Sequence, residues 1–173
     1  MYIYILMSED VPSFDSFDSM ISSDEDIQLI NSLEKEVLRK GHSLLETITN
    51  IEQRRKVYLQ VATSESLTAG LIMSSLVNLP IGGGAKYGCF GVYDTDAKRV
   101  FNNVKVYDVY THTCAKEMAV GILKNSNATI GISVTGNAMP YKEDLNKLGE
   151  VFIGVAGYVK TSDDKEVEII YKT

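Results

Sequence analysis

Ser66 is the first residue whose type and position suggest chemistry. It follows an apolar segment, 57–62, that predicts a β-strand, and it precedes a helix expected to begin near Thr68. A hydroxyl at such a junction lies beside the unpaired N–H groups of a helix start, which stabilise an oxyanion or a phosphate. Ser66 could therefore be a nucleophile, although serine at a helix start is more often a cap.

Lys98 is the second candidate. It ends the segment Tyr93-Asp94-Thr95-Asp96-Ala97-Lys98, which follows a short predicted strand at 90–93. A lysine with a lowered pKa can deprotonate a serine, and serine–lysine pairs act as catalytic dyads without histidine. Most lysines are simply solvated, so the segment alone leaves both interpretations open.

The third segment is Thr135-Gly136-Asn137-Ala138-Met139-Pro140, which follows an apolar strand at 128–134. Gly136 permits unusual backbone angles and Pro140 stiffens the exit from the turn. The segment is either a substrate loop or a surface turn.

Metal and phosphate-loop chemistry are not expected. Cys89, Cys114, His42 and His112 lie far apart and lack the close pairs that zinc sites use. The run 82–86 has three glycines and a lysine, but it lacks the glycine spacing and the hydroxyl residue of a phosphate loop. We therefore expect neither a metal site nor a phosphate loop.

The composition narrows the class of protein. The 173 residues are 45% hydrophobic and 23% charged, with a net charge of −6 and a pI near 4.9. Lys and Arg are scattered, so no nucleic-acid partner is expected. No apolar stretch is long enough to cross a membrane, and two cysteines fit a reducing compartment, so we expect a cytoplasmic protein without a membrane partner.

The chain pattern predicts an acidic extension at 1–26 and one domain at 27–173. Apolar residues at helical spacing predict a helix from Ile27 to Leu38 that ends at Gly41, then a second helix through Leu44 and Ile51. Strands and helices alternate afterwards, with a helix from 71 that ends before Pro80, a helix capped by Thr111, and strands at 151–159 and 167–171. The prediction is a three-layer α/β/α fold with a central mixed sheet and an N-terminal helical extension.

Together the three segments resemble the C-terminal domain of the CinA family of competence and damage inducible proteins. The shared pattern is strand-Ser-Glu-Ser-x-Thr-x-Gly-helix, then Tyr-x-x-x-Ala-Lys, then Val-Thr-Gly-x-Ala-x-Pro followed by Gly-x-Val-x-Ile. The family's usual strings are Ala-Glu-Ser-Cys-Thr-Gly-Gly, Tyr-Ser-Asn-Glu-Ala-Lys and Val-Thr-Gly-Ile-Ala-Gly-Pro. The resemblance covers about 57–158.

The resemblance implies a nicotinamide mononucleotide amidohydrolase, which releases nicotinic acid mononucleotide and ammonia through an acyl-enzyme. The implied reaction requires no metal and no organic cofactor. It makes Ser66 the nucleophile, with Tyr93 and Lys98 activating it and relaying its proton. The substrate-binding groups would be Thr68, the N–H groups of Ala69 and Gly70, and a loop with Thr135 and Gly136. The implied partners are a small-molecule nucleotide and further copies of the chain, with a homodimer favoured.

Some positions depart from the family strings. Leu67 replaces a cysteine, Ala69 replaces a glycine, and the run 141–147 replaces a glycine-rich loop. The alternative is therefore a catalytically inactive CinA-like protein that binds a nucleotide or a protein partner.

Overall fold

The computed structural model describes residues 24–137, 149–160 and 167–172. The chain divides into two compact units, Met1–Arg39 and Lys40–Thr173. The described part of the first unit is the first half of one long helix, α2 (Asp24–Arg55). The expected division into an extension at 1–26 and a domain at 27–173 stays a prediction. Residues 1–23, which make up most of the expected acidic extension at 1–26, and residues 138–148 lie outside the described residues.

The second unit is built on a five-stranded sheet. Its strands are β1 (Val61–Glu65), β2 (Lys86–Gly91), β3 (Ile130–Gly136), β4 (Val151–Lys160) and β5 (Val167–Lys172). Its remaining helices are α3 (Leu71–Val77), the short 3₁₀ helix η1 (Gly83–Ala85), α4 (Thr95–Asn102) and α5 (His112–Lys124).

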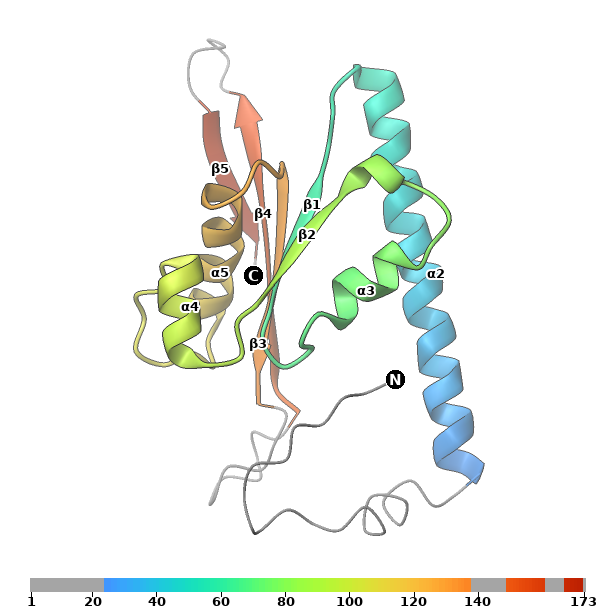
Figure 1. The fold of residues 1–173 in the computed structure, drawn as a ribbon, viewed down its shortest axis with the longest axis horizontal. Coiled ribbons are helices and arrows are strands. Elements are labelled where there is room, and N and C mark those ends of the chain that lie inside the picture. The colour runs from blue at the N-terminus through green and yellow to red at the C-terminus, as the bar shows by residue number, and fades with distance from the viewer. Residues whose placement is uncertain (1–23, 138–148, 161–166, 173) are drawn as a thin grey trace. The chain divides into compact units, whose positions relative to one another are not determined.

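The sheet is mixed, with the strand order β2-β1-β3-β4-β5. β1 pairs in parallel with both β2 and β3, whereas β4 runs antiparallel to β3 and to β5. Helices α4 and α5 lie on one side of this sheet and α3 lies on the other (Figure 1). The predicted α/β fold with a central mixed sheet and an N-terminal helix is therefore confirmed.

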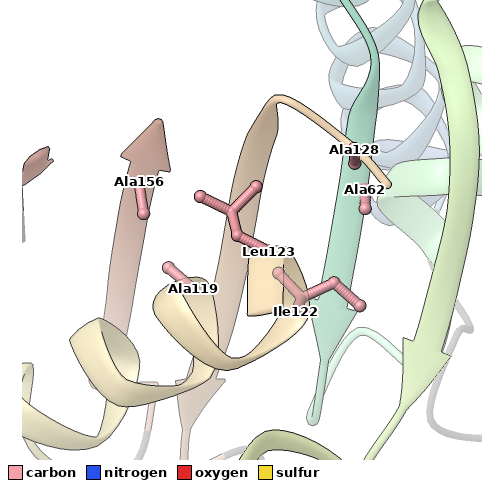
Figure 2. Close-up of a cluster of buried hydrophobic side chains, with 6 residues drawn as sticks. All are labelled: Ala62, Ala119, Ile122, Leu123, Ala128 and Ala156. Atoms are coloured by element: carbon pink, nitrogen blue, oxygen red, sulfur yellow. The ribbon is translucent and has the colours of Figure 1, made fainter. Parts of the chain in front are cut away.

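Helix α5 packs directly on the sheet. Figure 2 shows Ala119, Ile122 and Leu123 of α5 against Ala62 of β1 and Ala156 of β4, in a buried cluster that includes Ala128. Glycines make this close approach possible. A Cβ at Gly131 would meet the carbonyl oxygen of Ala119, and one at Gly154 would meet that of Ala115. The rigid contact fixes β3 and β4 beneath the helix.

On the other face, Leu45 and Ile48 of α2 pack with Val61 and Leu76. The predicted helix end at Gly41 is wrong, since α2 continues through it. A Cβ at Gly41 would lie 3.1 Å from Leu79 Cδ1 and 3.3 Å from Leu76 Cδ2, so the glycine serves close packing rather than termination. Tertiary packing has overridden the low helix propensity of glycine here.

Two strands are displaced from their predicted positions. The strand expected at 57–62 begins only at Val61 and continues through the polar residues 63–65, which are fully buried. The strand expected at 90–93 is β2, which ends at Gly91. The sequence pattern predicts a strand where apolar residues follow one another. In the structure, polar residues complete β1, because their buried side chains have hydrogen-bond partners inside the protein.

In the part of the chain that the structure describes, no helix is both long enough and apolar enough to span a membrane.

Candidate active site at the carboxyl edge of the sheet

The three parallel strands bring the candidate segments to one edge of the sheet. In the parallel register Glu65, the last residue of β1, is level with Gly91 at the end of β2 and with Val134 on β3. The Ser66 N–H donates to the Val134 carbonyl at 3.0 Å, and the Val92 N–H donates to the Glu65 carbonyl at 2.8 Å. The segments that follow these strands therefore begin within a few residues of one another, at the edge where α/β proteins form their sites.

Buried polar side chains concentrate at this edge. Those on the strands and the adjoining turn are Thr63, Ser64, Glu65, Ser66, Ser133 and Thr135, and those on α4 are Lys98 and Asn102. Most have hydrogen-bond partners within the protein, such as Ser64 Oγ, which donates to Asn102 Oδ1 at 2.9 Å. A polar network of this density inside an apolar fold is typical of a functional site.

Glu65 organises the turn that follows β1. Its Oε2 accepts hydrogen bonds from the Thr68 hydroxyl at 2.8 Å, the Gly70 N–H at 2.9 Å and the Ile72 N–H at 3.0 Å. Its Oε1 accepts from the Thr63 hydroxyl at 2.8 Å and from the Met73 N–H at 2.9 Å.

The carboxylate of Glu65 is ionised in this setting. Burial alone would raise the pKa of Glu65, but the hydrogen bonds from the Met73 and Ile72 N–H groups and from the Thr63 and Thr68 hydroxyls outweigh it. The net effect lowers the pKa of Glu65 below its usual value. The negative charge also lies at the positive end of helix α3, where the helix dipole favours it.

This arrangement changes what the turn can offer to a ligand. The expected donors of Thr68 and Gly70 are already bound to Glu65, and the Ala69 N–H donates to the Ser66 carbonyl at 3.1 Å. In this geometry an internal carboxylate occupies the start of α3, where these groups were expected to face an incoming anion. Their direct contact with a substrate stays a prediction.

Ser66 itself is well placed. Its side chain is 5% exposed, and its backbone is held to β3 by the bond to Val134. Within the described residues the Ser66 hydroxyl donates no hydrogen bond, and none joins it to Lys98 or Tyr93. A serine with a fixed backbone and an uncommitted hydroxyl is suited to receive a partner from a substrate or a base.

Ala69 and Gly70 give the turn its shape. Ala69 has a φ of 50° and Gly70 a φ of 100°, both in the left-handed region. Glycine adopts this region without penalty, whereas a residue with a Cβ is strained there. The CinA-type string has glycine at the Ala69 position, so the departure noted in the sequence falls on a backbone conformation that favours glycine.

Lys98 is a buried lysine in the first turn of α4. Only 2% of it is exposed, and its Nζ donates to the backbone carbonyl of Tyr93 at 2.7 Å. Burial lowers the pKa of Lys98 below its usual range, and the negative charges that Cys114 and Asp94 carry when ionised oppose this shift only in part. Lys98 is therefore easier to deprotonate than a solvated lysine, as a general base requires.

Burial and the neighbouring Lys98 also determine the protonation state of Cys114. Burial raises the pKa of the Cys114 thiol to about 11, although Lys98 lowers it. The thiol is therefore neutral near pH 7 and adds no charge beside the lysine. Cys89 and Cys114 are both free, and burial also raises the pKa of Cys89.

Tyr93 contributes its backbone to the site. Its carbonyl accepts the Lys98 hydrogen bond, while its side chain is 69% exposed. The hydroxyl of Tyr93 forms no hydrogen bond in the described part of the chain. The structure therefore joins Tyr93 to Lys98 through the main chain, and the expected proton relay through the phenol stays a prediction.

Thr135 and Gly136 end β3. The Thr135 hydroxyl is buried and donates to the Val109 carbonyl at 2.9 Å, which ties β3 to the segment before α5. A Cβ at Gly136 would meet the Glu150 carbonyl oxygen, so close pairing with β4 accounts for this glycine. Both residues have packing roles here, and their contact with a nucleotide stays a prediction.

The sequence analysis missed Glu65 as the centre of this turn. A signal was present, since an acidic residue stood directly before a predicted helix start, where carboxylates often accept helix N–H bonds. Among the residues described, no group of three His, Cys, Asp or Glu side chains is placed to hold a metal ion.

The fold and the site define an α/β protein with three parallel strands at the centre of its sheet. A serine and a buried lysine lie at the carboxyl edge of these strands. Residues 42–169 match the model of the CinA C-terminal domain. Because that match covers most of the chain, the chain belongs to the CinA family.

Related sequences and structures agree. A "CinA-like protein" from Dictyoglomus turgidum is 36% identical over 119 residues, covering 65% of this chain and 28% of the relative. Another "CinA-like protein", from Chloroherpeton thalassium, is 36% identical over 59% of this chain and 26% of the relative. The chain thus spans little more than a quarter of these two relatives.

Solved structures share the fold. The competence/damage inducible protein CihA from Agrobacterium tumefaciens has a TM-score of 0.57 and 26% identity, covering 80% of this chain and 78% of that one. A competence or damage-inducible protein from Enterobacter asburiae has a TM-score of 0.59 and 20% identity, covering 79% of this chain and 82% of that one.

Proposed function

We propose that this chain is a CinA-type amidohydrolase that hydrolyses the carboxamide of nicotinamide mononucleotide to nicotinic acid mononucleotide and ammonia. The observation that carries the proposal is the buried Lys98, with its lowered pKa, at the same sheet edge as the uncommitted hydroxyl of Ser66. The reaction needs a nucleophile and a base that gives up its own proton more readily than a solvated lysine does. Ser66 and Lys98 are of these chemical types, and burial lowers the pKa of Lys98 in the required direction.

In the proposed reaction, neutral Lys98 takes the proton of the Ser66 hydroxyl as Oγ attacks the amide carbon. The lysine then passes that proton to the departing nitrogen, which leaves as ammonia and gives an ester to Ser66. Water attacks the ester, one of its protons returns to Ser66 Oγ and the other is released to solvent, and the product leaves as the free carboxylate. Tyr93 positions the base through its carbonyl, which accepts the Lys98 Nζ hydrogen bond. Its exposed hydroxyl is the proposed relay between Ser66 and Lys98 when the two do not meet directly.

The oxyanion requires donors that Glu65 has not taken. In the described structure no acceptor within the protein binds the N–H groups of Leu67 and Thr68. They directly follow Ser66, which is where serine hydrolases place one such donor. We assign the binding of the oxyanion to these two N–H groups, in place of those of Ala69 and Gly70. Thr135 and Gly136 keep their proposed place, lining the nucleotide side of the site.

The test is ammonia release from nicotinamide mononucleotide by the purified chain. We expect Ser66→Ala and Lys98→Met each to abolish release, while Ser74→Ala, an exposed serine on α3, retains it. Circular dichroism of each variant would show that the fold persists. A well-folded wild type that releases no ammonia would reject the proposal.

A binding protein without catalysis is the second candidate function. It is favoured by one observation: no hydrogen bond in the described structure joins the Ser66 hydroxyl to Lys98 or to Tyr93. A thermal shift with nicotinamide mononucleotide and no turnover would support it, because a ligand at a hundred times its dissociation constant stabilises by about 2.7 kcal/mol. Turnover that depends on Ser66 would exclude it.

A further inference from the structure

A pocket lies between the carboxyl end of α4 and the second half of α5, two helices that pack side by side (Figure 1). Its volume is about 270 Å³. A Cβ at Gly121 would meet the backbone carbonyl of Asn102, so the two helices touch at the pocket itself. Pockets for drug-sized ligands span about 300–1,000 Å³, so this one suits a ligand of fewer atoms.

The pocket is basic, although the chain as a whole carries a net charge of −6. Lys105, Lys116 and Lys124 line it, against one carboxylate, that of Glu117. In the part of the chain that the structure describes, the ammonium groups of Lys105 and Lys124 form no ion pair and no hydrogen bond. Lysines that share a pocket repel one another, and an anion placed among them relieves that repulsion.

Glu117 has a structural task of its own. Its Oε2 accepts hydrogen bonds from the backbone N–H of Lys105 at 2.6 Å and from that of Val106 at 3.2 Å. The carboxylate thus fastens the segment after α4 to α5 and shapes the wall of the pocket. Its charge offsets that of one lysine, and two positive charges remain.

The backbone carbonyls at the ends of the helices could repel an anion, since a helix is negative at its carboxyl end. Several of these carbonyls already have donors within the protein. The Arg99 carbonyl accepts the Asn103 N–H at 3.0 Å. The side chain of Asn125 donates to the Phe101 carbonyl at 2.7 Å, and its N–H donates to the Gly121 carbonyl at 3.0 Å. These bonds reduce the negative potential, and the lysines outweigh what remains.

We propose that this pocket binds a small phosphate monoester, with the phosphate held by Lys105 and Lys124 and the carbon skeleton against Val120 and Gly121. Lysine binds phosphate as a point charge, without the fixed geometry that arginine requires. Lys116 adds to the positive potential.

The pocket is separate from the site of the proposed reaction. The bond from the Thr135 hydroxyl to the Val109 carbonyl holds the segment before α5 at the carboxyl edge of the sheet. Lys124 is the last residue of α5, on the path that leads to the start of β3 at Ile130. It therefore lies toward the opposite edge, and the proposed binding does not depend on catalysis by Ser66.

An NMR titration of the full chain, labelled with ¹⁵N, tests the proposal with glycerol 3-phosphate at constant ionic strength. We expect saturable shifts of the backbone N–H signals of Gly121 and Asn125. Glycerol at the same concentrations is the uncharged control and should cause no saturable shift. The absence of saturation with glycerol 3-phosphate, or saturable shifts confined to residues outside the pocket, would overturn the proposal.

Paired substitutions test the role of the lysines. Lys105→Met combined with Lys124→Met should weaken binding about tenfold, since each exposed charge contact contributes up to about fivefold. The matched control, Lys35→Met with Lys56→Met, removes two exposed lysines outside the pocket and should retain the wild-type affinity. Circular dichroism would show that each variant is folded. Unchanged binding in the first pair, or equal weakening in both, would overturn the proposal.

Glu117→Gln gives a change of opposite sign. Glutamine keeps one oxygen for the N–H groups of Lys105 and Val106 but removes the negative charge. Binding of glycerol 3-phosphate should therefore become about threefold tighter. Weaker or unchanged binding in this variant, with the fold retained, would contradict an anion site.

Discussion

Replacing Glu65 with glutamine should unfold much of the turn that bears Ser66. The substitution keeps the shape of the side chain but exchanges one oxygen for an NH₂ group, which donates. If that group takes the place of Oε2, the N–H groups of Gly70 and Ile72 lose their acceptor. The Thr68 hydroxyl can rotate to accept instead, so it is not counted.

The cost follows from those two groups. Both N–H groups are partly buried. A buried donor left without a partner costs about 1–3 kcal/mol, so two partly buried donors cost about 2–4 kcal/mol, in the lower half of the range for two. The loss of the negative charge at the start of α3 adds about 0.3–1 kcal/mol more, the usual size of a helix-dipole interaction. We expect Glu65→Gln to lower the free energy of unfolding by about 2–5 kcal/mol.

The pH dependence gives a second, independent signature. The pKa of Glu65 is lowered in the folded protein from its usual value of 4.5. A group with a lowered folded pKa stabilises the protein above its unfolded pKa, and that stability is lost as the pH falls through the folded value. The wild type should therefore lose stability below about pH 4.5 more steeply than Glu65→Gln, which has no group to protonate there.

The assay is urea denaturation followed by circular dichroism at several pH values. Glu150→Gln is the control, since Glu150 is exposed. It should match the wild type closely near neutral pH. A Glu65→Gln variant destabilised by less than about 1 kcal/mol, or one whose acid limb equals that of the wild type, would refute the role assigned to Glu65.

Two backbone positions give further predictions. Ala69→Gly should raise the free energy of unfolding by about 0.5–1 kcal/mol, because relief of the strained positive φ outweighs the added freedom of the unfolded chain. Thermal denaturation measures this, and a lower melting temperature than that of the wild type would contradict it. Gly154→Ala should lower the free energy of unfolding by at least about 2 kcal/mol, since its Cβ would meet the Ala115 carbonyl and Ser133 Oγ. Gly88→Ala is the control and should leave the stability almost unchanged, because open space surrounds this position. If the two substitutions changed the free energy of unfolding equally, α5 would be able to move away from β4, and the close packing inferred here would be contradicted.

Much of the fold was predictable where a local rule and the tertiary structure agree. Thr111 caps α5 as expected, its hydroxyl accepting the Cys114 N–H at 3.1 Å. Helix α3 ends at Val77, before Pro80. Local hydrogen bonds and the geometry of proline determine these features, and both are visible in the sequence.

Features that depend on distant partners were not predictable. Gly41 stops a helix in isolation, but here it faces Leu76 and Leu79, which lie far along the chain. The polar residues 63–65 belong to a buried strand only because partners such as Asn102 receive their side chains.

The candidate site shows the same limit. Its residue types were visible in the sequence, and the alternation of strands and helices favours a site at the strand ends. The order of the strands, which brings the segments to one edge, was not predicted. The burial of Lys98 depends on how α4 packs on its neighbours, and the filling of the start of α3 by Glu65 depends on a turn with two positive φ angles. Neither is encoded in the spacing of the motifs.

The pH dependence of ammonia release from nicotinamide mononucleotide tests the central claim most directly, because kcat/KM reports the pKa of the base in the free enzyme. With Lys98 as that base, kcat/KM should rise to a plateau with an apparent pKa below the ordinary lysine value of 10.5, and Lys98→Arg should abolish the rise with the activity. Release that is unchanged in Lys98→Arg, or that persists in Ser66→Ala, would contradict the assignment of these two residues.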